Sequence, residues 1–527
     1  MIGQTTYPTM PQEIEIRFAA CPRDLARVAK SSKLHGYVLG RAAKQRLNSI
    51  YYDTPELSLA KAGLSLRVRK NGGSYVQTVK DESSGAVLSQ RSEYECKLSS
   101  PHPDPDLVSD THMRERLRGI VNGTQVEPTV ETDILRVKRS VKSAAGDEIE
   151  LAVDRGEIRA GTNAGAAIPV GEIELELKRG NPAVLYDVAR QLSRKVPLTA
   201  GIESKLARGI RVLEGREIGT HKAGRVELPE DCTAEEAFRA ILFHCLRHIA
   251  RNTEAVAQAR LPEGVHQIRV GLRRLRAAIS AFGDEFRVRE LETLRERAKI
   301  RADGFGDTRE LDVFAMELLA PVEESAKKMP GLPQLRLVLD ELRRDSWDRT
   351  VALVRSDDFT GFLLDLAAAI ESRSWREAAP AESVLAFLRP ARDLASNALD
   401  RKMKQACKRG RGLSSLDIQD RHRLRIALKK LRYSAEFFAS LFRAKDVSSF
   451  LQRLSKLQDL FGSLNDAAAA ETVVRRIVDH AGPRADVEFL EAAAFIEGWH
   501  KSQIEPTWKK AQKRWKQFAK AGAFWKD

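Results

Sequence analysis

The chain has 527 residues, with 31% charged and 43% hydrophobic side chains and a formal net charge of +15. These values exclude an intrinsically disordered chain, and the length predicts at least two domains that each bury a core. The basic charge favours acidic partners. No apolar run is long enough to cross a membrane, and the five widely spaced cysteines form no CxxC pair. The first residues include no basic residue before Arg17 and no apolar run, so a secretory signal is not expected. We therefore expect a cytoplasmic protein with free thiols.

Residues 12–212 are predicted to form a strand-rich domain, because charged and apolar residues alternate there with the period of two typical of β-strands. Turn-forming residues at 71–74 separate two of the strands, and helices are expected at 22–32 and 182–195. The alternation recurs in five stretches, which are 13–18, 64–69, 91–95, 148–151 and 172–178.

Most of these strands carry charges of a single sign on their charged face. If the strands close into a barrel whose outer side is apolar and covered, the charged faces line the lumen. Carboxylates there would bind divalent metals and cations would bind phosphate oxygens, which suits phosphoryl transfer. An open sheet with solvated charges is the alternative interpretation. The charged faces consist of Glu13 and Glu15, Arg67 and Arg69, Glu93 and Glu95, and Glu172, Glu174 and Glu176.

A polar, glycine-containing linker at 213–229 separates this domain from a second one. From 230 to 525 the apolar residues follow long helical periods, which predicts an all-α domain. Prolines at 330–333 and 380 indicate a join between two helical repeats, at about 230–330 and 384–490.

The helical region carries one basic motif twice, at an offset of 156 residues. The spacing places the four residues of each copy within an arc of about 80° on one helix face, with leucines on the opposite face. Because these cations repel one another, the two stripes predict a bound polyanion. A solvated basic face is the alternative, but it would not require matching cations. The stripes consist of His266, Arg269, Arg273 and Arg276, and of His422, Arg425, Lys429 and Arg432.

Residues 13–205 resemble the CYTH domain of the triphosphate tunnel metalloenzymes. The resemblance implies an eight-stranded antiparallel β tunnel barrel with flanking helices, which hydrolyses a triphosphate with Mg²⁺ or Mn²⁺. The matching residues are Glu13-Ile14-Glu15-Ile16-Arg17, Tyr51-Tyr52-Asp53-Thr54, Leu66-Arg67-Val68-Arg69, Gln77-Thr78-Val79-Lys80, residues 172–178, and Ser204-Lys205.

The same resemblance implies roles for the charged residues. In this chain Arg17 stands where the family motif normally has lysine, and its bulkier planar head can shift substrate preference or slow turnover. The implied metal ligands are Glu13, Glu15, Glu172, Glu174 and Glu176. The implied catalytic cations are Arg17, Lys80 and Lys205, and the implied substrate-binding cations are Arg67, Arg69, Arg91, Arg136 and Lys138.

The helical region, about 230–525, resembles the CHAD domain. This resemblance implies two repeats of four helices that bind inorganic polyphosphate through the basic stripes. Glu310 stands where an aspartate is usual, and we expect it to alter a helix-end contact rather than binding. The matching residues are Val265-His266-Gln267-Ile268-Arg269, Leu431-Arg432-Tyr433, Leu457-Gln458-Asp459 and Leu464-Asn465-Asp466.

Together the two regions resemble bacterial CYTH–CHAD inorganic triphosphatases. This resemblance predicts hydrolysis of inorganic triphosphate to pyrophosphate and phosphate. It also predicts that the protein binds polyphosphate and associates with polyphosphate granules. Two alternatives stay open: a non-catalytic polyphosphate-binding protein, and a tunnel enzyme that acts on an organic triphosphate such as ATP or thiamine triphosphate. A membrane is not expected as a partner. Nucleic acid is not expected either, because residues 401–432 hold 12 basic residues but no aromatic residue for base stacking.

Overall fold

A computed structural model describes residues 12–31, 33–81, 89–161, 167–201, 203–520 and 522–526. The chain divides into two compact units. The tunnel unit consists of Met1–His221, Ala250–Ala259 and Val354–Ser372, and the helical unit of Lys222–Ile249, Arg260–Leu353 and Arg373–Asp527. Two segments from the helical half of the sequence therefore belong to the tunnel unit. Among the helices in the described ranges, none has the length and apolar character needed to span a membrane.

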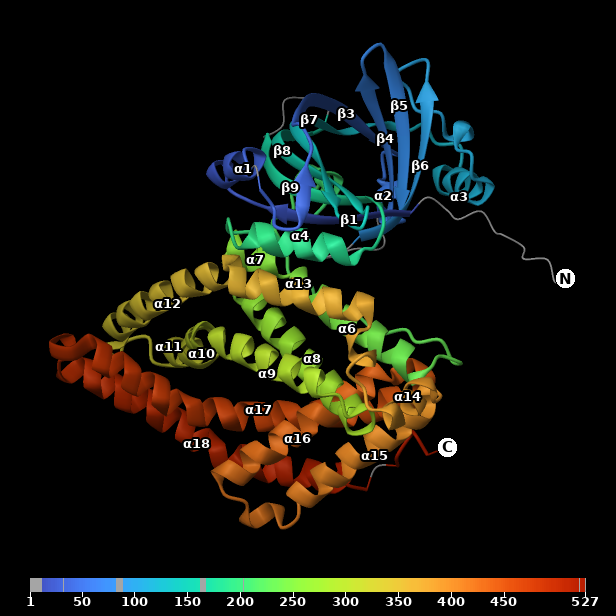
Figure 1. The fold of residues 1–527 in the computed structure, drawn as a ribbon. Coiled ribbons are helices and arrows are strands. Elements are labelled where there is room, and N and C mark those ends of the chain that lie inside the picture. The colour runs from blue at the N-terminus through green and yellow to red at the C-terminus, as the bar shows by residue number, and fades with distance from the viewer. Residues whose placement is uncertain are drawn as a thin grey trace. The chain divides into compact units, whose positions relative to one another are not determined.

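Eight antiparallel strands of the tunnel unit form a closed barrel (Figure 1). They follow the order β1-β6-β5-β4-β3-β7-β8-β9, and β9 pairs back with β1, where Leu177 lies opposite Ile14. The predicted eight-stranded antiparallel barrel is confirmed. Two short strands extend the sheet, β2 beside β7 and β10 beside β1. The strands are β1 (Gln12–Ala19), β2 (Tyr37–Leu39), β3 (Ala43–Asp53), β4 (Leu64–Asn71), β5 (Ser74–Asp81), β6 (Ser89–Leu98), β7 (Glu127–Ser143), β8 (Glu148–Ala160), β9 (Ile168–Arg179) and β10 (Thr199–Ala200).

The alternating sequence of β4 shows how the barrel separates its two faces. Leu66 and Val68 are buried in an apolar cluster that includes residues of α3 (Thr111–Val121), whereas Arg67 and Arg69 line the interior. Burying each aliphatic side chain stabilises the fold by roughly 1.5–3 kcal/mol. The apolar faces of the strands therefore pack against the covering helices, and the charged faces line the lumen of the barrel.

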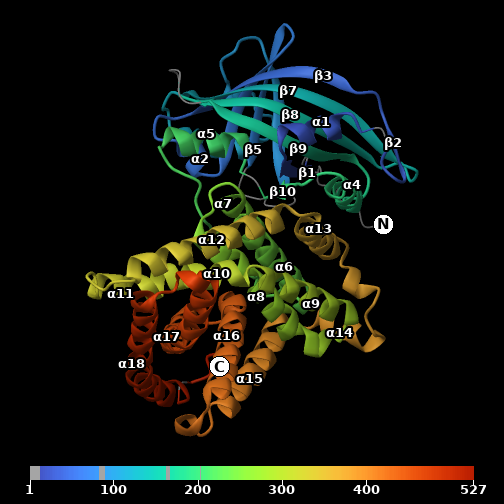
Figure 2. The same cartoon turned by 90° about the vertical axis from the view of Figure 1, so that its left-hand side faces the viewer.

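Helix α5 (Lys205–Leu213) carries Lys205 in its first turn and packs against β7 and β8 (Figure 2). The Ser204 hydroxyl accepts a hydrogen bond from the backbone N–H of Ala207 and caps the helix. Gly209 permits the close approach to β7, because a Cβ there would lie 2.5 Å from Cγ1 of Val130. The other helices of the tunnel unit are α1 (Pro22–Ala29), α2 (Ser58–Lys61), α4 (Ala183–Ser193), α7 (Thr253–Ala257) and α13 (Asp357–Ser372).

The helical unit is all-α, as predicted. Its longest helices, α17 and α18, pack side by side. Its α-helices are α6 (Ala234–Ala250), α8 (Pro262–Phe286), α9 (Arg289–Gly304), α10 (Gly306–Val313), α11 (Ala320–Ser325), α12 (Leu332–Arg355), α14 (Ala381–Leu388), α15 (Ala391–Arg409), α16 (Ile418–Phe437), α17 (Ala444–Ala481) and α18 (Val487–Phe518), and a π-helix spans Phe314–Leu319.

The repeat inferred from the basic motif extends over whole helices. Adding 156 to the first residue of α6, α8 and α12 gives positions 390, 418 and 488, which match the starts of α15, α16 and α18 to within one residue. The segment that contains α9 and α10 corresponds to the single helix α17. The four-helix correspondence thus runs past the predicted repeat ends near 330 and 490, to α12 and α18.

An aromatic cluster forms where the two repeats meet. Phe282 and Phe438 occupy equivalent positions in the repeat, and their ring centroids lie 5.6 Å apart. Phe238 packs on Phe282 at 4.8 Å, and all three rings are fully buried. This shared core places the two basic helices, α8 and α16, beside each other.

Candidate functional site

The barrel encloses a cavity of about 360 Å³ lined mainly by charged side chains. Among its described lining residues, eight Lys or Arg face eight Asp or Glu, so the interior is charge-balanced without a ligand. The cations are Arg17, Arg67, Arg69, Lys80, Arg136, Lys138, Lys178 and Lys205, and the carboxylates are Glu13, Glu15, Glu93, Glu95, Glu150, Asp154, Glu174 and Glu176.

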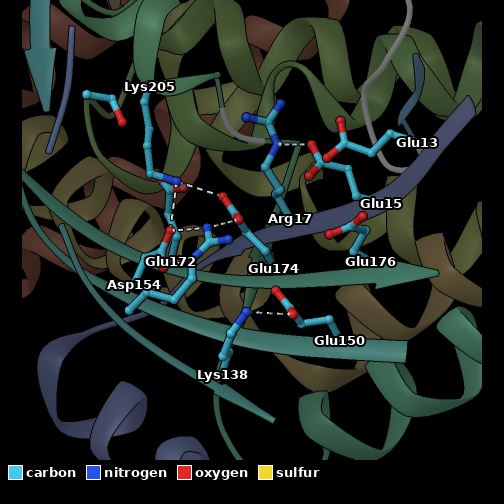
Figure 3. Close-up of polar contacts among 12 residues, drawn as sticks. Glu13, Glu15, Arg17, Lys138, Glu150, Asp154, Glu172, Glu174, Glu176 and Lys205 are labelled. Carbon is cyan, nitrogen blue, oxygen red and sulfur yellow. Dashed lines mark hydrogen bonds and ion pairs between the residues drawn. The ribbon is translucent and has the colours of Figure 1, made fainter. Parts of the chain in front are cut away.

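Lys205 reaches from α5 to three carboxylates on β8 and β9 (Figure 3). Its Nζ lies 3.0 Å from Asp154, 2.7 Å from Glu172 and 2.6 Å from Glu174. Burial disfavours its charge, but Glu174 and Asp154 outweigh this and raise the pKa of Lys205. These three carboxylates have the spacing of a metal site, and the ammonium occupies the position that a cation would take.

Two arginines complete this cluster. Arg136 on β7 binds Asp154 with two hydrogen bonds of 2.7 Å and also pairs with Glu174. Although burial opposes ionisation, Arg136 and Lys205 hold the pKa of Glu174 well below its usual range. Arg208, one turn along α5 from Lys205, pairs with Glu172, which is fully buried. Glu172 therefore has both carboxylate oxygens engaged, and it is absent from the described lining of the cavity.

A second group lies around the start of β1. Lys80 on β5 donates to Glu13 at 2.6 Å and lies 3.1 Å from Glu93. Burial acts against the charge of Lys80, but Glu13 and Glu93 raise its pKa above the usual value. Arg17 contacts Glu15 at 3.3 Å and also faces Glu174 across the β1–β9 pair. The conspicuous Arg17 therefore lies in the lumen beside two of the implied metal ligands.

A third group of charged side chains surrounds Glu176. Burial raises the pKa of Glu176, and the neighbouring carboxylates Glu13 and Glu150 raise it further, although Lys178 opposes them. Lys138 lies 3.4 Å from Glu150. A carboxylate whose charge is disfavoured by burial and by neighbouring carboxylates gains from a bound cation, and carboxylate oxygens are the donors that Mg²⁺ and Mn²⁺ prefer.

Arg67 and Arg69 come from adjacent inward positions of β4. Arg67 donates to the Thr78 hydroxyl at 3.0 Å, and Arg69 donates to Ser49 at 3.1 Å. The charge of Arg67, together with burial, lowers the pKa of Arg69 to about 10. Arg67 also lies 3.9 Å from Glu93. Two guanidinium groups from neighbouring inward positions of one strand are suited to an anion with several charged oxygens.

The lumen contains residues that the sequence motifs did not identify. Asp154 continues the alternation of Glu148 and Glu150 along β8 and could have been found by extending that strand. Arg208 had no such signal, because only the packing of α5 brings it to Glu172. Arg91 is on β6, and its side chain lies outside the described part of the chain. Glu93 and Glu95, which strand alternation placed on a charged face, also line the cavity. Tyr51, Glu150 and Lys178 are further lining residues without an implied role.

In the helical unit, the two basic stripes meet at two adjoining cavities of about 820 and 670 Å³. The repeat does not form two separate sites, because α8 and α16 contribute jointly to both cavities. Arg269 lines the smaller cavity and Arg432 the larger one. The residues shared by both cavities are His266, Arg273, Glu317, Arg425, Lys429 and Asp466.

Two stripe residues lie apart from these cavities. His422 is exposed and its Nδ1 lies 3.2 Å from Oδ1 of Asn465. Arg276 is absent from the described lining of both cavities, and Arg295 and Arg273 contribute to its lowered pKa, together with burial as the largest cause. Arg432 is in the lining but is paired with Glu436 at 2.7 Å.

The remaining stripe cations are half-buried, and their charges act on one another. Burial, Arg425 and Arg273 lower the pKa of Lys429 to about 7. Burial and Arg273 lower that of Arg269 to about 10, and burial with Arg309 lowers that of His266 to about 4. His266 is therefore neutral at physiological pH.

Carboxylates compensate these charges only in part. Asp466 is the acidic group that raises the pKa of Lys429, and Glu310 pairs with Arg476 at 3.3 Å rather than with a stripe residue. Within the described ranges, the buried Nε atoms of Arg269, Arg273 and Arg425 have no hydrogen-bond partner. A buried donor without a partner is destabilising, so this cavity is arranged for an anion.

The chain contains a CYTH domain followed by a CHAD domain. The family models for these domains match residues 11–210 and 240–475. An inorganic triphosphatase of Haemophilus influenzae is 29% identical over 208 residues, which are 38% of this chain and 54% of that protein. The chain thus spans about half the length of this curated relative.

Two further proteins are similar to this chain. An uncharacterised protein of Mycobacterium tuberculosis is 24% identical over 459 residues, with 81% of each chain covered. The crystal structure of the CHAD domain from the plant Ricinus communis aligns with a TM-score of 0.49 and 26% identity, covering 56% of this chain and 96% of that one.

Proposed function

We propose that the CYTH barrel hydrolyses inorganic triphosphate to pyrophosphate and phosphate in a metal-dependent reaction. The observation that carries this proposal is the enclosed, charge-balanced lumen, in which cations and carboxylates from all sides converge on about 360 Å³. The similarity to an inorganic triphosphatase supports the choice of reaction. Phosphoryl transfer depends mainly on positioning and charge stabilisation, which such a lining supplies.

In this proposal Glu13, Glu15 and Glu176 hold Mg²⁺ or Mn²⁺, with Glu174 as a further ligand. When bound, the metal would neutralise phosphate charge and lower the pKa of a water molecule. Glu172 serves instead to anchor Lys205 and Arg208, because both of its oxygens are engaged. This assignment leaves out Asp154 and Glu172, two of the three carboxylates that pair with the ammonium of Lys205.

The cations of the lumen would bind and orient the triphosphate. Arg67 and Arg69 would bind phosphate oxygens as forked donors, with Arg136 and Lys138 from β7 on another side of the lumen. Lys80, Lys205 and Arg17 would stabilise charge on the phosphate that is transferred. The side chain of Arg17 keeps its charge at any physiological pH, so we expect turnover to survive the exchange of lysine for arginine.

An inorganic substrate is favoured over ATP or thiamine triphosphate. Among the described lining residues, Tyr51 is the only aromatic side chain, and Leu47 and Ile134 are the only aliphatic ones. Recognition of a base or thiazole ring relies on flat apolar contacts, which this lining offers at one position only.

The first experiment measures phosphate release by the purified full-length chain with Mg²⁺ or Mn²⁺. We expect faster release from tripolyphosphate than from ATP, and loss of release in the Glu13→Ala/Glu15→Ala variant. The matched control is Glu488→Ala/Glu491→Ala, which removes two exposed carboxylates of α18. Hydrolysis undiminished in the lumen variant, or absent from the wild type with every divalent metal, contradicts the proposal. Absence with retained anion binding favours the non-catalytic alternative.

We also propose that the CHAD domain binds inorganic polyphosphate in the cavities between α8 and α16. The observation that supports this is that the buried Nε atoms of Arg269, Arg273 and Arg425 have no hydrogen-bond partner within the described ranges. A phosphate chain would supply several anionic acceptors at once. Binding of this kind weakens as salt increases, because mobile ions screen and replace the contacts.

Its test compares two triple variants in a polyphosphate-binding titration. Arg273→Gln/Arg425→Gln/Lys429→Gln should weaken binding by at least tenfold and reduce its salt dependence. Arg423→Gln/Lys404→Gln/Lys408→Gln removes the same charge from exposed positions of α15 and α16 and should have a small effect. Equal weakening by both triple variants would show that net charge, rather than the cavity, binds the polyanion.

A further inference from the structure

Two helices from the CHAD-matched region belong to the tunnel unit. Helices α7 and α13 lie within residues 240–475, yet they form one compact unit with the barrel. Both contact the stretch 198–203, which leads directly into Ser204 and Lys205 at the start of α5.

Helix α7 contacts this stretch through two buried side chains. The Thr253 hydroxyl donates to the backbone carbonyl of Ala200, and the Glu254 carboxylate accepts the backbone N–H of Glu203 at 3.3 Å. Both side chains are buried, and Gln258 also donates to Glu254 at 3.1 Å. These two hydrogen bonds therefore hold the backbone at Ala200 and at Glu203.

Gly201 shows how closely the two segments approach. Its φ of +76° lies in the left-handed region, and a Cβ at this position would lie 2.2 Å from the carbonyl oxygen of Ala250. A larger residue here would separate the stretch from the residues that precede α7.

Helix α13 holds the same stretch from its other end. The buried Thr360 hydroxyl donates to the carbonyl oxygen of Leu198 at 2.6 Å. Asp357, at the start of α13, accepts from Ser193 at 2.6 Å and pairs with Arg190 of α4. Figure 1 shows α13 beside α4, and the contacts between the two helices agree with it.

A line of charges continues from α7 to the lumen. Arg208 is buried between two carboxylates: it pairs with Glu172, and the charge of Glu254 acts to raise its pKa while burial lowers it. Glu172 in turn accepts from Lys205 at 2.7 Å. Glu254 thus acts on both the backbone that precedes α5 and an α5 side chain, that of Arg208.

We propose that α7 and α13 are functional parts of the tunnel, with Thr253, Glu254 and Thr360 as positioning residues that hold Lys205 at Asp154, Glu172 and Glu174. This inference rests on the proposed triphosphatase activity and adds that the barrel sequence alone does not complete its site. A small displacement of the Lys205 ammonium would weaken its stabilisation of charge in the transition state. Substrate binding would be reduced less, because many other cations also bind the substrate.

The test uses Thr253→Val and Thr360→Val in the full-length chain, which remove a hydroxyl and keep the shape. We expect kcat for tripolyphosphate to fall about tenfold in each, with KM changed by less than about threefold, and Thr→Ser at each position to restore kcat. The control is Thr350→Val, which removes an equally buried hydroxyl that bonds Thr308 in the helical unit. If the control lowers kcat as much at equal thermal stability, the positioning role is wrong.

Amide hydrogen exchange over residues 198–213 gives a readout that does not depend on activity. Thr253→Val, Thr360→Val and Glu254→Gln should speed exchange there, and Thr350→Val should not. Should the wild type hydrolyse no triphosphate, the proposed function fails, and this measurement still decides the inference. Unchanged exchange in all three variants would overturn it.

Discussion

The barrel lumen and the adjoining CHAD cavities handle charge in opposite ways. In the barrel, each described cluster of cations contacts carboxylates, as Lys205 does with three of them. In the CHAD cavity, Arg269, Arg273, Arg425 and Lys429 lie near one another, and burial lowers the pKa of Lys429 to about 7. A balanced interior is stable when empty and can exchange its ion pairs for a metal and a phosphate chain. An unbalanced interior gains stability only when an anion enters.

Removing one cation from the balanced cavity should have the largest effect. Lys205→Met leaves Asp154, Glu172 and Glu174 without their shared ammonium. We expect a loss of about 3–5 kcal/mol in the free energy of unfolding and of at least about a hundredfold in kcat. Urea unfolding and steady-state kinetics measure these, with the exposed Lys44→Met as control. A variant as stable and active as the control would show that the cluster is not coupled to folding or catalysis.

Polyphosphate binding should depend on pH through Lys429. Its pKa of about 7 in the free protein rises when an anion binds, so binding takes up a proton above pH 7. Arg425 on the same helix, Arg273 and Arg269 on α8, and Asp466 on α17 surround this amine. We expect affinity to fall about tenfold from pH 7 to pH 8.5, measured by titration calorimetry in two buffers. Lys429→Arg should remove this dependence; its persistence would assign the proton to another group.

The same residue should destabilise the protein when no anion is present. The pKa of Lys429 is about 7 in the folded protein and about 10.5 in the unfolded chain. Between pH 7 and 10.5 the unfolded chain therefore holds more of this proton than the folded protein does. The destabilisation caused by the charged Lys429 side chain has its full size below pH 7 and disappears as the pH rises towards 10.5. At pH 7 we expect Lys429→Met to raise the free energy of unfolding by about 1 kcal/mol, the opposite sign to Lys205→Met. A loss of stability would show that Lys429 is better compensated than its surroundings indicate.

The smallest effect is expected at Arg17. Arg17→Lys keeps the positive charge beside Glu15 and changes only the shape of its head, so kcat and KM for tripolyphosphate should change by less than about threefold. Initial rates at several substrate concentrations measure both. A gain of tenfold or more would show that arginine limits turnover at this position.

Much of the architecture could be predicted because it depends on the local periodicity of apolar and charged residues along the chain. The alternation in 64–69 predicts β4, and its arginines line the lumen. The repeated histidine–arginine motif predicts one helix at each copy. In the structure these helices are α8, which begins at Pro262, and α16, which begins at Ile418. Asp154 lay within reach of the same reasoning, since it continues the inward face of β8.

The sequence by itself determined which faces are charged, how the strands alternate and that the basic helix occurs twice, because side-chain periodicity and propensity act between neighbours along the chain. Only the tertiary structure decided which charges meet. It placed Lys205 among three carboxylates, merged the two stripes at adjoining cavities, and added α7 and α13 to the tunnel unit. Those contacts join residues far apart in sequence, and no local pattern specifies them.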